Sequence, residues 1–393
     1  TKTATRLAEE LEAAGFGVAQ GIGKTGLVAV MKNGDGPTVL MRADMDGLPV
    51  QEKSGLSYAS HAIQADPNGV MQPVMHACGH DVHITSLVGT ARLMASMKDK
   101  WSGTLMLLGQ PAEERFGGAR IMREDGLYDK FPKPDYAFAF HVNSQMEGGK
   151  IWVADEAAYA GVESVNITVH GVGAHGAAPH AGKDPIVLAS QIVMGLQTLI
   201  SREISPRTPG VVTVGSFHSG SKHNIISDEA KLQLTVRYDD LETRDTLLAG
   251  IKRIAENMGL VAGLKEDQLP SVEVLSTEAY PPTRNTADLV GRMKKVWAEK
   301  LGNDIFAANY KSLSMGAEDF PFLVTDLETF DPIVPSVYFA VGGTPKADFD
   351  AAANGGAPVA SHHSPLFKVN PDMSVPVGVE ATIVALLEMM PKK

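Results

Sequence analysis

The chain has 393 residues, more than one hydrophobic core normally organises, so two domains or one large domain with an insertion are expected. Hydrophobic residues make up 44% and charged residues 21%, which is typical of a packed globular protein and excludes wholesale disorder. The formal net charge of -11 disfavours nucleic acid as a partner, and no apolar run approaches the ~20 residues that a membrane span requires.

The single cysteine, Cys78, cannot form an internal disulfide, so the fold does not depend on an oxidising compartment. The sequence begins at Thr1, at the start of a helical pattern, and a targeting segment upstream of it would not be visible. We therefore expect a soluble protein and leave open whether it is cytoplasmic or exported.

The first part of the chain alternates helical patterns with short apolar runs. Apolar residues recur at helical spacing in 4–16 and again in 84–97. The runs 37–41, 103–109 and 135–142 are too short and too continuous for surface helices, and they predict strands that are buried on both faces. This order is typical of an α/β layer with a mostly parallel sheet.

From about Val162 the strands alternate instead. In "KLQLTVRY" (231–238) the apolar residues point one way and the polar ones, including Arg237, the other, which predicts a half-buried antiparallel strand. Two helices accompany such strands, one with Asp184 as N-cap and one over 243–258. Together they indicate a small α+β domain.

The α/β pattern returns after a proline-bearing passage near 276–286. We expect a helix over 286–301, a strand over 336–343, a flexible loop at 351–357 and a closing helix over 375–390. The predicted organisation is a discontinuous α/β domain, 1–160 and 276–393, interrupted by an inserted α+β domain, 161–275.

The stretch "MHACGHDVH" (75–83) holds Cys78 between two histidines, His76 and His80. A lone cysteine is most often a buried apolar residue, and it can also be a nucleophile or a metal ligand. The nucleophile is the weaker alternative, because a catalytic Cys/His pair is normally assembled from distant positions.

Other residues of the metal-binding types follow predicted strands, where ligands bind in an open α/β sheet. "GQPAEE" follows the strand 103–109, and "SHHSP" precedes the last helix. One crevice could therefore collect Cys78, His80, Glu114, His141 and one of His362 or His363. These five ligands exceed what one tetrahedral ion takes, which suggests two ions. Of the two adjacent glutamates, one would face the metal and the other would act as a general base on the metal-bound water.

The motifs "MRADMDGLPV", "MHACGHDVH", "GQPAEE", "GVGAHGAAPH", "KHNIISDEAKLQLTVR", "GAEDF" and "HHSP" occur in this order along nearly the whole chain. In order and spacing they resemble the aminoacylase and carboxypeptidase family of metal-dependent amidohydrolases. The most similar branch contains hippurate hydrolase, bacterial N-acyl-amino-acid amidohydrolases and plant auxin-conjugate hydrolases.

The resemblance implies a di-zinc peptidase-like catalytic domain with two divalent ions, zinc or else manganese, cobalt or nickel. The implied metal ligands are Cys78, His80, Glu114, His141 and His363. Glu113 is implied as the general base, and the residues implied to orient the ligands are Asp44, Asp46, Asp81 and His83. His76 and His362 receive no role.

The inserted domain resembles the family's lid, which implies a homodimer. His175 corresponds to a histidine that reaches the active site of the partner subunit, and Asn224 and Arg237 correspond to residues that hold the substrate carboxylate. Ala174 and Ser227 depart from the usual glycine and proline on this substrate side.

The implied reaction is hydrolysis of the amide bond of an N-acyl amino acid by a metal-activated water. The alternatives are a dipeptidase or carboxypeptidase on the same site, a catalytically silent relative that binds metal or ligand, and a thiol hydrolase using Cys78.

Overall fold

The computed structural model describes residues 2–66, 68–115, 117–308, 310–312 and 315–392. The chain forms two compact units. Unit 1 comprises Thr1–Ala158, Arg284–Leu313 and Asp319–Lys393, and unit 2 comprises Tyr159–Thr283 and Ser314–Glu318. The two short strands β9 (Ala157–Tyr159) and β16 (Thr283–Arg284) lie where the chain passes between the units.

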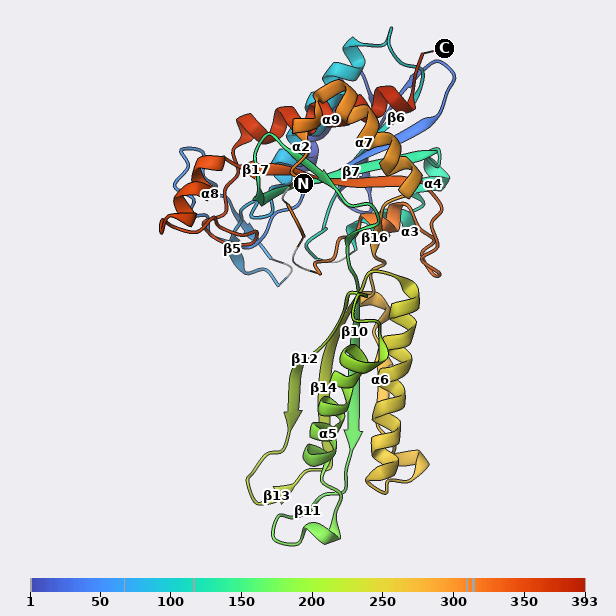
Figure 1. Cartoon of the computed structure of the whole chain (residues 1–393), viewed down its shortest axis with the longest axis vertical. Helices are drawn as coiled ribbons and strands as arrows, with labels where there is room; N and C mark the ends of the chain where they lie inside the picture. Colours follow the sequence, from blue (N-terminus) through green and yellow to red (C-terminus); the bar gives the residue numbers. More distant parts are fainter. Residues whose placement is uncertain (1, 67, 116, 309, 313–314, 393) are drawn as a thin grey trace. The chain divides into compact units, whose positions relative to one another are not determined.

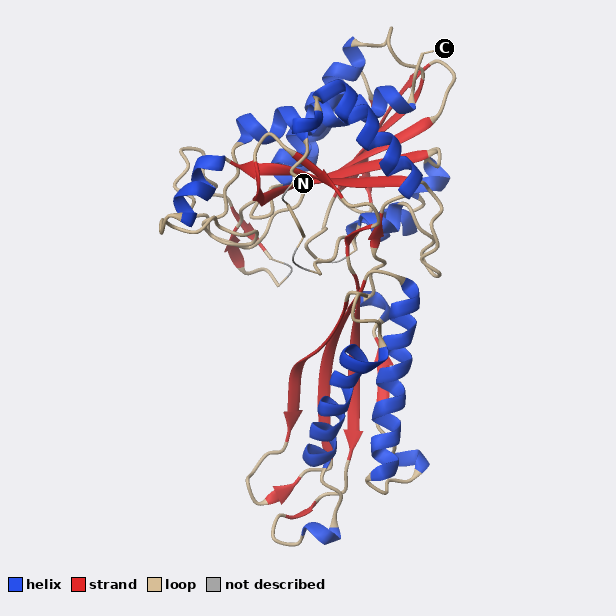
Figure 2. Cartoon of the chain, in the orientation of Figure 1, coloured by secondary structure: helices blue, strands red, loops and turns tan. Residues whose placement is uncertain are grey.

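A seven-stranded mixed sheet runs through unit 1 (Figures 1 and 2), in the order β1-β2-β6-β3-β7-β17-β8. The four strands β6, β3, β7 and β17 are parallel, and the outer strands pair antiparallel. Its strands are β1 (Gly17–Ile22), β2 (Gly26–Asn33), β3 (Thr38–Asp44), β6 (Gly103–Gln110), β7 (Tyr136–Glu147), β8 (Ile151–Val153) and β17 (Ser336–Thr344). A separate hairpin is formed by β4 (Ile63–Ala65) and β5 (Met71–Pro73).

The central strands are buried along almost their whole length because both faces of the sheet are covered. Every residue of β17 is buried, and so is every residue of β3 and β6 apart from Thr38 and Thr104. Helices α2 and α9 pack against each other and against strands of the sheet. The helices of unit 1 are α1 (Lys2–Ala13), α2 (His80–Ser96), α3 (Gly118–Glu124), α4 (Leu127–Lys130), α7 (Ala287–Leu301), α8 (Lys346–Ala353) and α9 (Pro371–Met389).

Unit 2 has a four-stranded antiparallel sheet in the order β12-β14-β10-β15, against which two helices pack (Figure 2). Its elements are β10 (Gly161–His170), β11 (Ala174–His175), α5 (Pro185–Thr198), β12 (Gly210–Ser219), β13 (Ile225–Ile226), β14 (Glu229–Tyr238), α6 (Leu241–Val261) and β15 (Ser271–Val274). As predicted, alternate residues of β14 are buried, and the Asp184 carboxylate caps α5 by accepting from two backbone N–H groups of its first turn.

This architecture confirms the predicted α/β class with an α+β part. Two details differ. The antiparallel strands β1 and β2 were not predicted, and the expected loop at 351–357 begins later, because its first three alanines complete α8. No helix in the described part of the chain is both long and apolar enough to span a bilayer.

Candidate metal centre

The strand register of unit 1 brings chemistry-bearing residues to one level of the sheet. Asp44, the last residue of β3, pairs with Gln110, the last residue of β6. On the other side of β3, Arg42 pairs with Ala139 of β7, so His141 lies two residues further on, level with Asp44. The site therefore lies at the carboxyl ends of parallel strands, where open α/β sheets bind ligands.

The turn into α2 brings Cys78 and His80 to the same place. Gly79, between them, has a φ of 81°, and a Cβ atom added there would lie 2.3 Å from Val142 Cγ1. Only glycine meets both conditions. Cys78 and His80 can therefore flank a turn that packs directly on β7.

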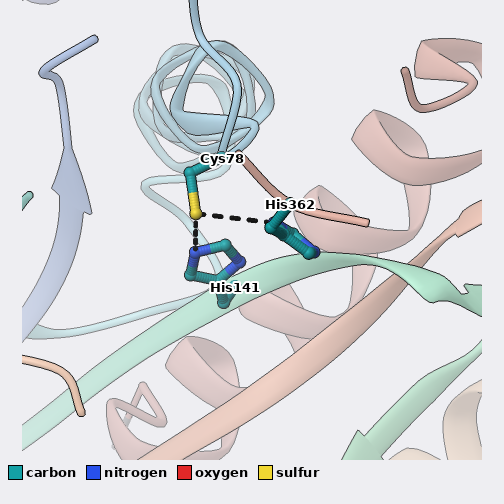
Figure 3. Close-up of side chains that lie close together, drawn as sticks. All are labelled: Cys78, His141 and His362. Carbon is teal, nitrogen blue, oxygen red and sulfur yellow. Dashed lines mark hydrogen bonds between the residues drawn. The ribbon is translucent and has the colours of Figure 1, made fainter. Parts of the chain in front are cut away.

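Cys78 lies between two histidines that come from distant parts of the chain (Figure 3). Its Sγ atom is 3.4 Å from His141 Nε2 and 3.4 Å from His362 Nδ1. A second group shares the sulfur, since ligand-type atoms of Cys78, His80 and Glu114 lie within 4.8 Å of one another. His363 Nε2 lies 3.1 Å from Glu114 Oε1. The five predicted ligands are thus brought together, with Cys78 common to both groups.

The second ring nitrogen of each histidine decides what the first can do. The Nδ1–H of His80 donates to the Asp46 carbonyl at 3.1 Å, and that of His141 donates to the Val142 carbonyl at 2.6 Å. Both rings therefore direct an Nε2 lone pair at the cluster when they are neutral. His80 Nε2 is buried and has no hydrogen-bond partner among the described residues, with Asp44 Oδ2 3.6 Å away, so its lone pair could bind an ion.

His362 is arranged in the opposite way. The backbone N–H of Ser144 donates to His362 Nε2 at 3.2 Å, so in the neutral ring the proton is on Nδ1, the atom that faces Cys78. Burial and the surrounding histidines hold the pKa of His362 well below its usual value, which keeps the ring neutral. His362 can therefore donate a hydrogen bond to the sulfur but has no free lone pair directed at the cluster. The adjacent His363 faces Glu114 instead.

The backbone conformation of His363 is unusual. His363 has a φ of 65°, a conformation that non-glycine residues rarely adopt, and its N–H donates to the Ala77 carbonyl at 2.9 Å. This hydrogen bond ties the loop before α9 to the stretch that carries Cys78. Such backbone strain is typical of functional sites.

Asp44, His80 and His83 form a further cluster whose ligand-type atoms lie within 4.8 Å of one another, but neither ring nitrogen of His83 is free to ligate. His83 Nδ1–H donates to Asp44 at 2.5 Å, and its Nε2 accepts from the Val142 N–H at 2.8 Å, so both ring nitrogens are used. Burial lowers the pKa of His83 to about 4, and burial likewise lowers that of His141 to about 4. Burial would raise the pKa of Asp44, but Arg42, His80 and His83 outweigh it and hold the pKa well below its usual value.

Asp46 joins three parts of the site, and through it His76 acquires a contact that the sequence did not indicate. The Asp46 carbonyl accepts from His80 and also from His76 Nδ1 at 2.9 Å. Its carboxylate accepts the backbone N–H of Glu114 at 3.0 Å. Asp46 lies in a loop outside regular secondary structure. No periodic pattern in the sequence could therefore have revealed its contacts.

The structure does not bring Asp81 to this cluster. Asp81 is exposed in the first turn of α2, and within the described residues no ion pair joins its carboxylate to the site. A carboxylate at a helix N-terminus interacts favourably with the helix dipole, which accounts for the position. The expectation that Asp81 orients a ligand is therefore not supported by its placement.

The charges around the sulfur and His80 also suit a cation. Burial, followed by the carboxylates of Glu114, Glu113 and Asp44, raises the pKa of Cys78 well above its usual value. Burial would lower the pKa of His80, yet Asp44, Asp46 and Glu114 raise it to about 9. A thiol that keeps its proton and a histidine that holds an extra one both mark a place that favours positive charge.

The three predicted residues of unit 2 fall at two different ends of it. His175 pairs with Ile225 in the β11–β13 ladder, directly after Asn224, and this ladder lies at one end of unit 2 (Figure 1). Arg237 is near the opposite end of β14, eight residues from Glu229, or about 26 Å at 3.3 Å per residue. Within one chain, Asn224 and Arg237 therefore do not meet.

Comparisons with known proteins agree with this site. A model of peptidase family M20/M25/M40 matches residues 40–355. The chain is 37% identical over 321 residues to the hippurate hydrolase of Campylobacter jejuni subsp. jejuni, across 81% of this chain and 79% of that protein. It is 34% identical over 345 residues to thermostable carboxypeptidase 2 of Saccharolobus solfataricus, across 86% and 80%.

The chain belongs to peptidase family M20/M25/M40. Membership confirms the resemblance inferred from the motifs and the prediction of a hydrolase that acts on amide bonds. The YXEP protein of Bacillus subtilis, described as a dinuclear metal binding peptidase from the M20 family, matches this structure with a TM-score of 0.78 and 25% identity. The match covers 99% of this chain and 92% of that protein.

Proposed function

We propose that this M20-family chain hydrolyses the amide bond between an acyl group and an amino acid, at a centre that holds two divalent ions. The observation that carries the proposal is the buried Nε2 of His80, which has no hydrogen-bond partner among the described residues and lies beside Cys78 and Glu114. The similarity to a hippurate hydrolase supports the substrate class.

The donor set fits the ions. Thiolate, imidazole and carboxylate together suit zinc, manganese, cobalt or nickel. Cys78 would be shared, with His141 on one side and His80, Glu114 and His363 on the other, and His362 would donate its Nδ1–H to the thiolate. Ions bound there would lower the pKa of water and polarise the scissile carbonyl.

Glu113 is the group that would move the proton. It follows β6 in the same loop as Glu114, and its charge contributes to the raised pKa of Cys78. Its carboxylate would take a proton from the attacking water and deliver it to the leaving nitrogen.

The separation inside unit 2 supports a dimer. A single substrate carboxylate can be held by both Asn224 and Arg237 only if the two residues come from different copies of the chain. In this proposal the His175 end of unit 2 serves the partner's active site, where His175 would stabilise the oxyanion, while the Arg237 end serves its own.

A carboxypeptidase acting on peptides is the second candidate, because thermostable carboxypeptidase 2 is a relative of similar identity. The two candidates share the centre and differ in the acyl side of the substrate. Comparison of kcat/KM for N-benzoyl and N-acetyl amino acids with that for dipeptides decides between them, and faster cleavage of the peptides would overturn the first.

Glu113→Gln tests the general base. The amide cannot accept the proton, so kcat should fall by at least about 100-fold, while the metal content stays as in the wild type. Glu124→Gln, on the surface of α3, is the matched control and should leave kcat unchanged. An active Glu113→Gln enzyme would sink the assignment.

The two adjacent histidines should differ when each is replaced by alanine. His363→Ala removes a ligand, so metal analysis at limiting metal should show about one ion instead of about two per chain. His362→Ala removes only a hydrogen bond to sulfur, so both ions should remain. The reverse result would exchange the two roles.

A mixture of two inactive variants tests the shared site. His175→Ala and Arg237→Ala should each be inactive alone, because every site lacks one residue. After subunit exchange, mixed dimers contain one complete site, and about a quarter of the wild-type activity should return. A mixture that stays inactive would contradict the proposed sharing.

A further inference from the structure

The Asp319 carboxylate is fully buried in unit 1 and belongs to the motif "GAEDF", to which no role has been assigned above. It accepts hydrogen bonds from three directions. Arg42 Nη2 donates to Oδ1 at 3.1 Å, Gln110 Nε2 also donates to Oδ1, and the backbone N–H of Ala119 donates to Oδ2 at 3.0 Å. Three separate chain segments therefore meet at this one side chain.

Two of these donors bracket the loop that carries Glu113 and Glu114. Gln110 is the last residue of β6, and Ala119 lies in the first turn of α3, so the loop begins and ends at Asp319. Because the Asp319 carboxylate accepts from Gln110 and from Ala119, it fixes the distance between the two ends of the loop.

The described residues of this loop include one tight approach and one strained residue. The N–H of Gly118 donates to the Ala112 carbonyl at 3.3 Å, and a Cβ atom on Gly118 would lie 1.6 Å from the Pro111 carbonyl oxygen. Ala112 has a φ of 51°, which is uncommon for a residue with a side chain. A strained conformation persists only where its surroundings enforce it.

The third donor connects Asp319 to the other side of the centre. Arg42 is fully buried, and its Nη1 donates to Asp44 Oδ2 at 2.8 Å while its Nε donates to Gln110 Oε1 at 2.8 Å. Asp44 in turn accepts from His83 and lies 3.6 Å from His80 Nε2. The Arg42 guanidinium is thus held between two carboxylates, and its position depends on both.

We propose that Asp319 is a positioning residue that sets the loop carrying Glu113 and Glu114, and, through Arg42 and Asp44, aligns that loop with His80. This inference rests on the proposed roles of Glu114 as a ligand and Glu113 as the base. In this proposal Asp319 acts through the groups that it holds, and its carboxylate also lies within 4.8 Å of the Glu113 carboxylate.

Asparagine is a demanding substitution here because the three groups that hydrogen-bond to Asp319 as described above are all donors. Asp319→Asn keeps the size but turns one acceptor into an NH2 group that faces a donor, and it leaves Arg42 with one carboxylate less. We expect kcat to fall by about 10- to 100-fold with little change in KM, and the affinity for added Zn²⁺ to fall by a similar factor. Steady-state kinetics and a Zn²⁺ titration against a chromophoric chelator measure the two effects.

Glu163→Gln is the matched control. Glu163 is a buried carboxylate of unit 2 that accepts from Arg244 and from Tyr238, so its neutralisation is a similar loss in the unit that does not contain the loop. It should lower Tm and leave the Zn²⁺ affinity unchanged. If Asp319→Asn fails to fold, Gln110→Met removes one end of the bracket and should lower kcat and Zn²⁺ affinity in the same direction.

The inference is overturned if Asp319→Asn, or Gln110→Met in its place, lowers only Tm and keeps the kcat and Zn²⁺ affinity of the wild type. The wild-type measurements judge the proposed function separately. Wild-type protein that binds Zn²⁺ but cleaves no N-acyl amino acid refutes the substrate class, and the ratio of Zn²⁺ affinities still tests Asp319. Wild-type protein that binds no Zn²⁺ refutes both.

Discussion

The pairing of Arg42 with two buried carboxylates is the constraint on which the rest of the site depends. A guanidinium without solvent exposure is tolerable only with full compensation, which Asp44 and Asp319 supply on either side. Asp44 then fixes His83 and attracts positive charge to His80, while Asp319 fixes the loop of Glu113 and Glu114. The same ion pairs that satisfy a buried charge therefore also hold the residues of the proposed metal centre.

The sequence predicted most reliably the elements whose pattern lies within a single segment. The continuous apolar runs in β3 and β6 and the alternation in β14 predicted those strands, because burial on two faces or on one imposes the pattern locally. Strands β1 and β2 were missed. Strand β1 is exposed along much of its length and contains Gly21, whereas β2 carries the apolar run 27–31, which was not singled out. The site residues could be named from motifs, but their contacts could not: Arg42 and Asp319 are 277 residues apart.

The roles of individual histidines could not be predicted from the sequence. The motif "HHSP" left the choice between His362 and His363 to resemblance. In the structure His362 contacts Ser144 and Cys78, whereas His363 contacts Glu114. His76 had no predicted role, and its Nδ1–H donates to the Asp46 carbonyl. In each case the decisive fact is the direction of one ring nitrogen, which depends on backbone groups from other segments.

The central claim is that Cys78 joins two ions held by residues of unit 1. X-ray absorption spectroscopy of the zinc-loaded protein tests it most directly, because sulfur and a second metal are both distinguishable from light scatterers. The account predicts a sulfur shell at about 2.3 Å and a metal–metal distance of about 3.5 to 4 Å. A shell of nitrogen and oxygen alone, with no second metal, would contradict it.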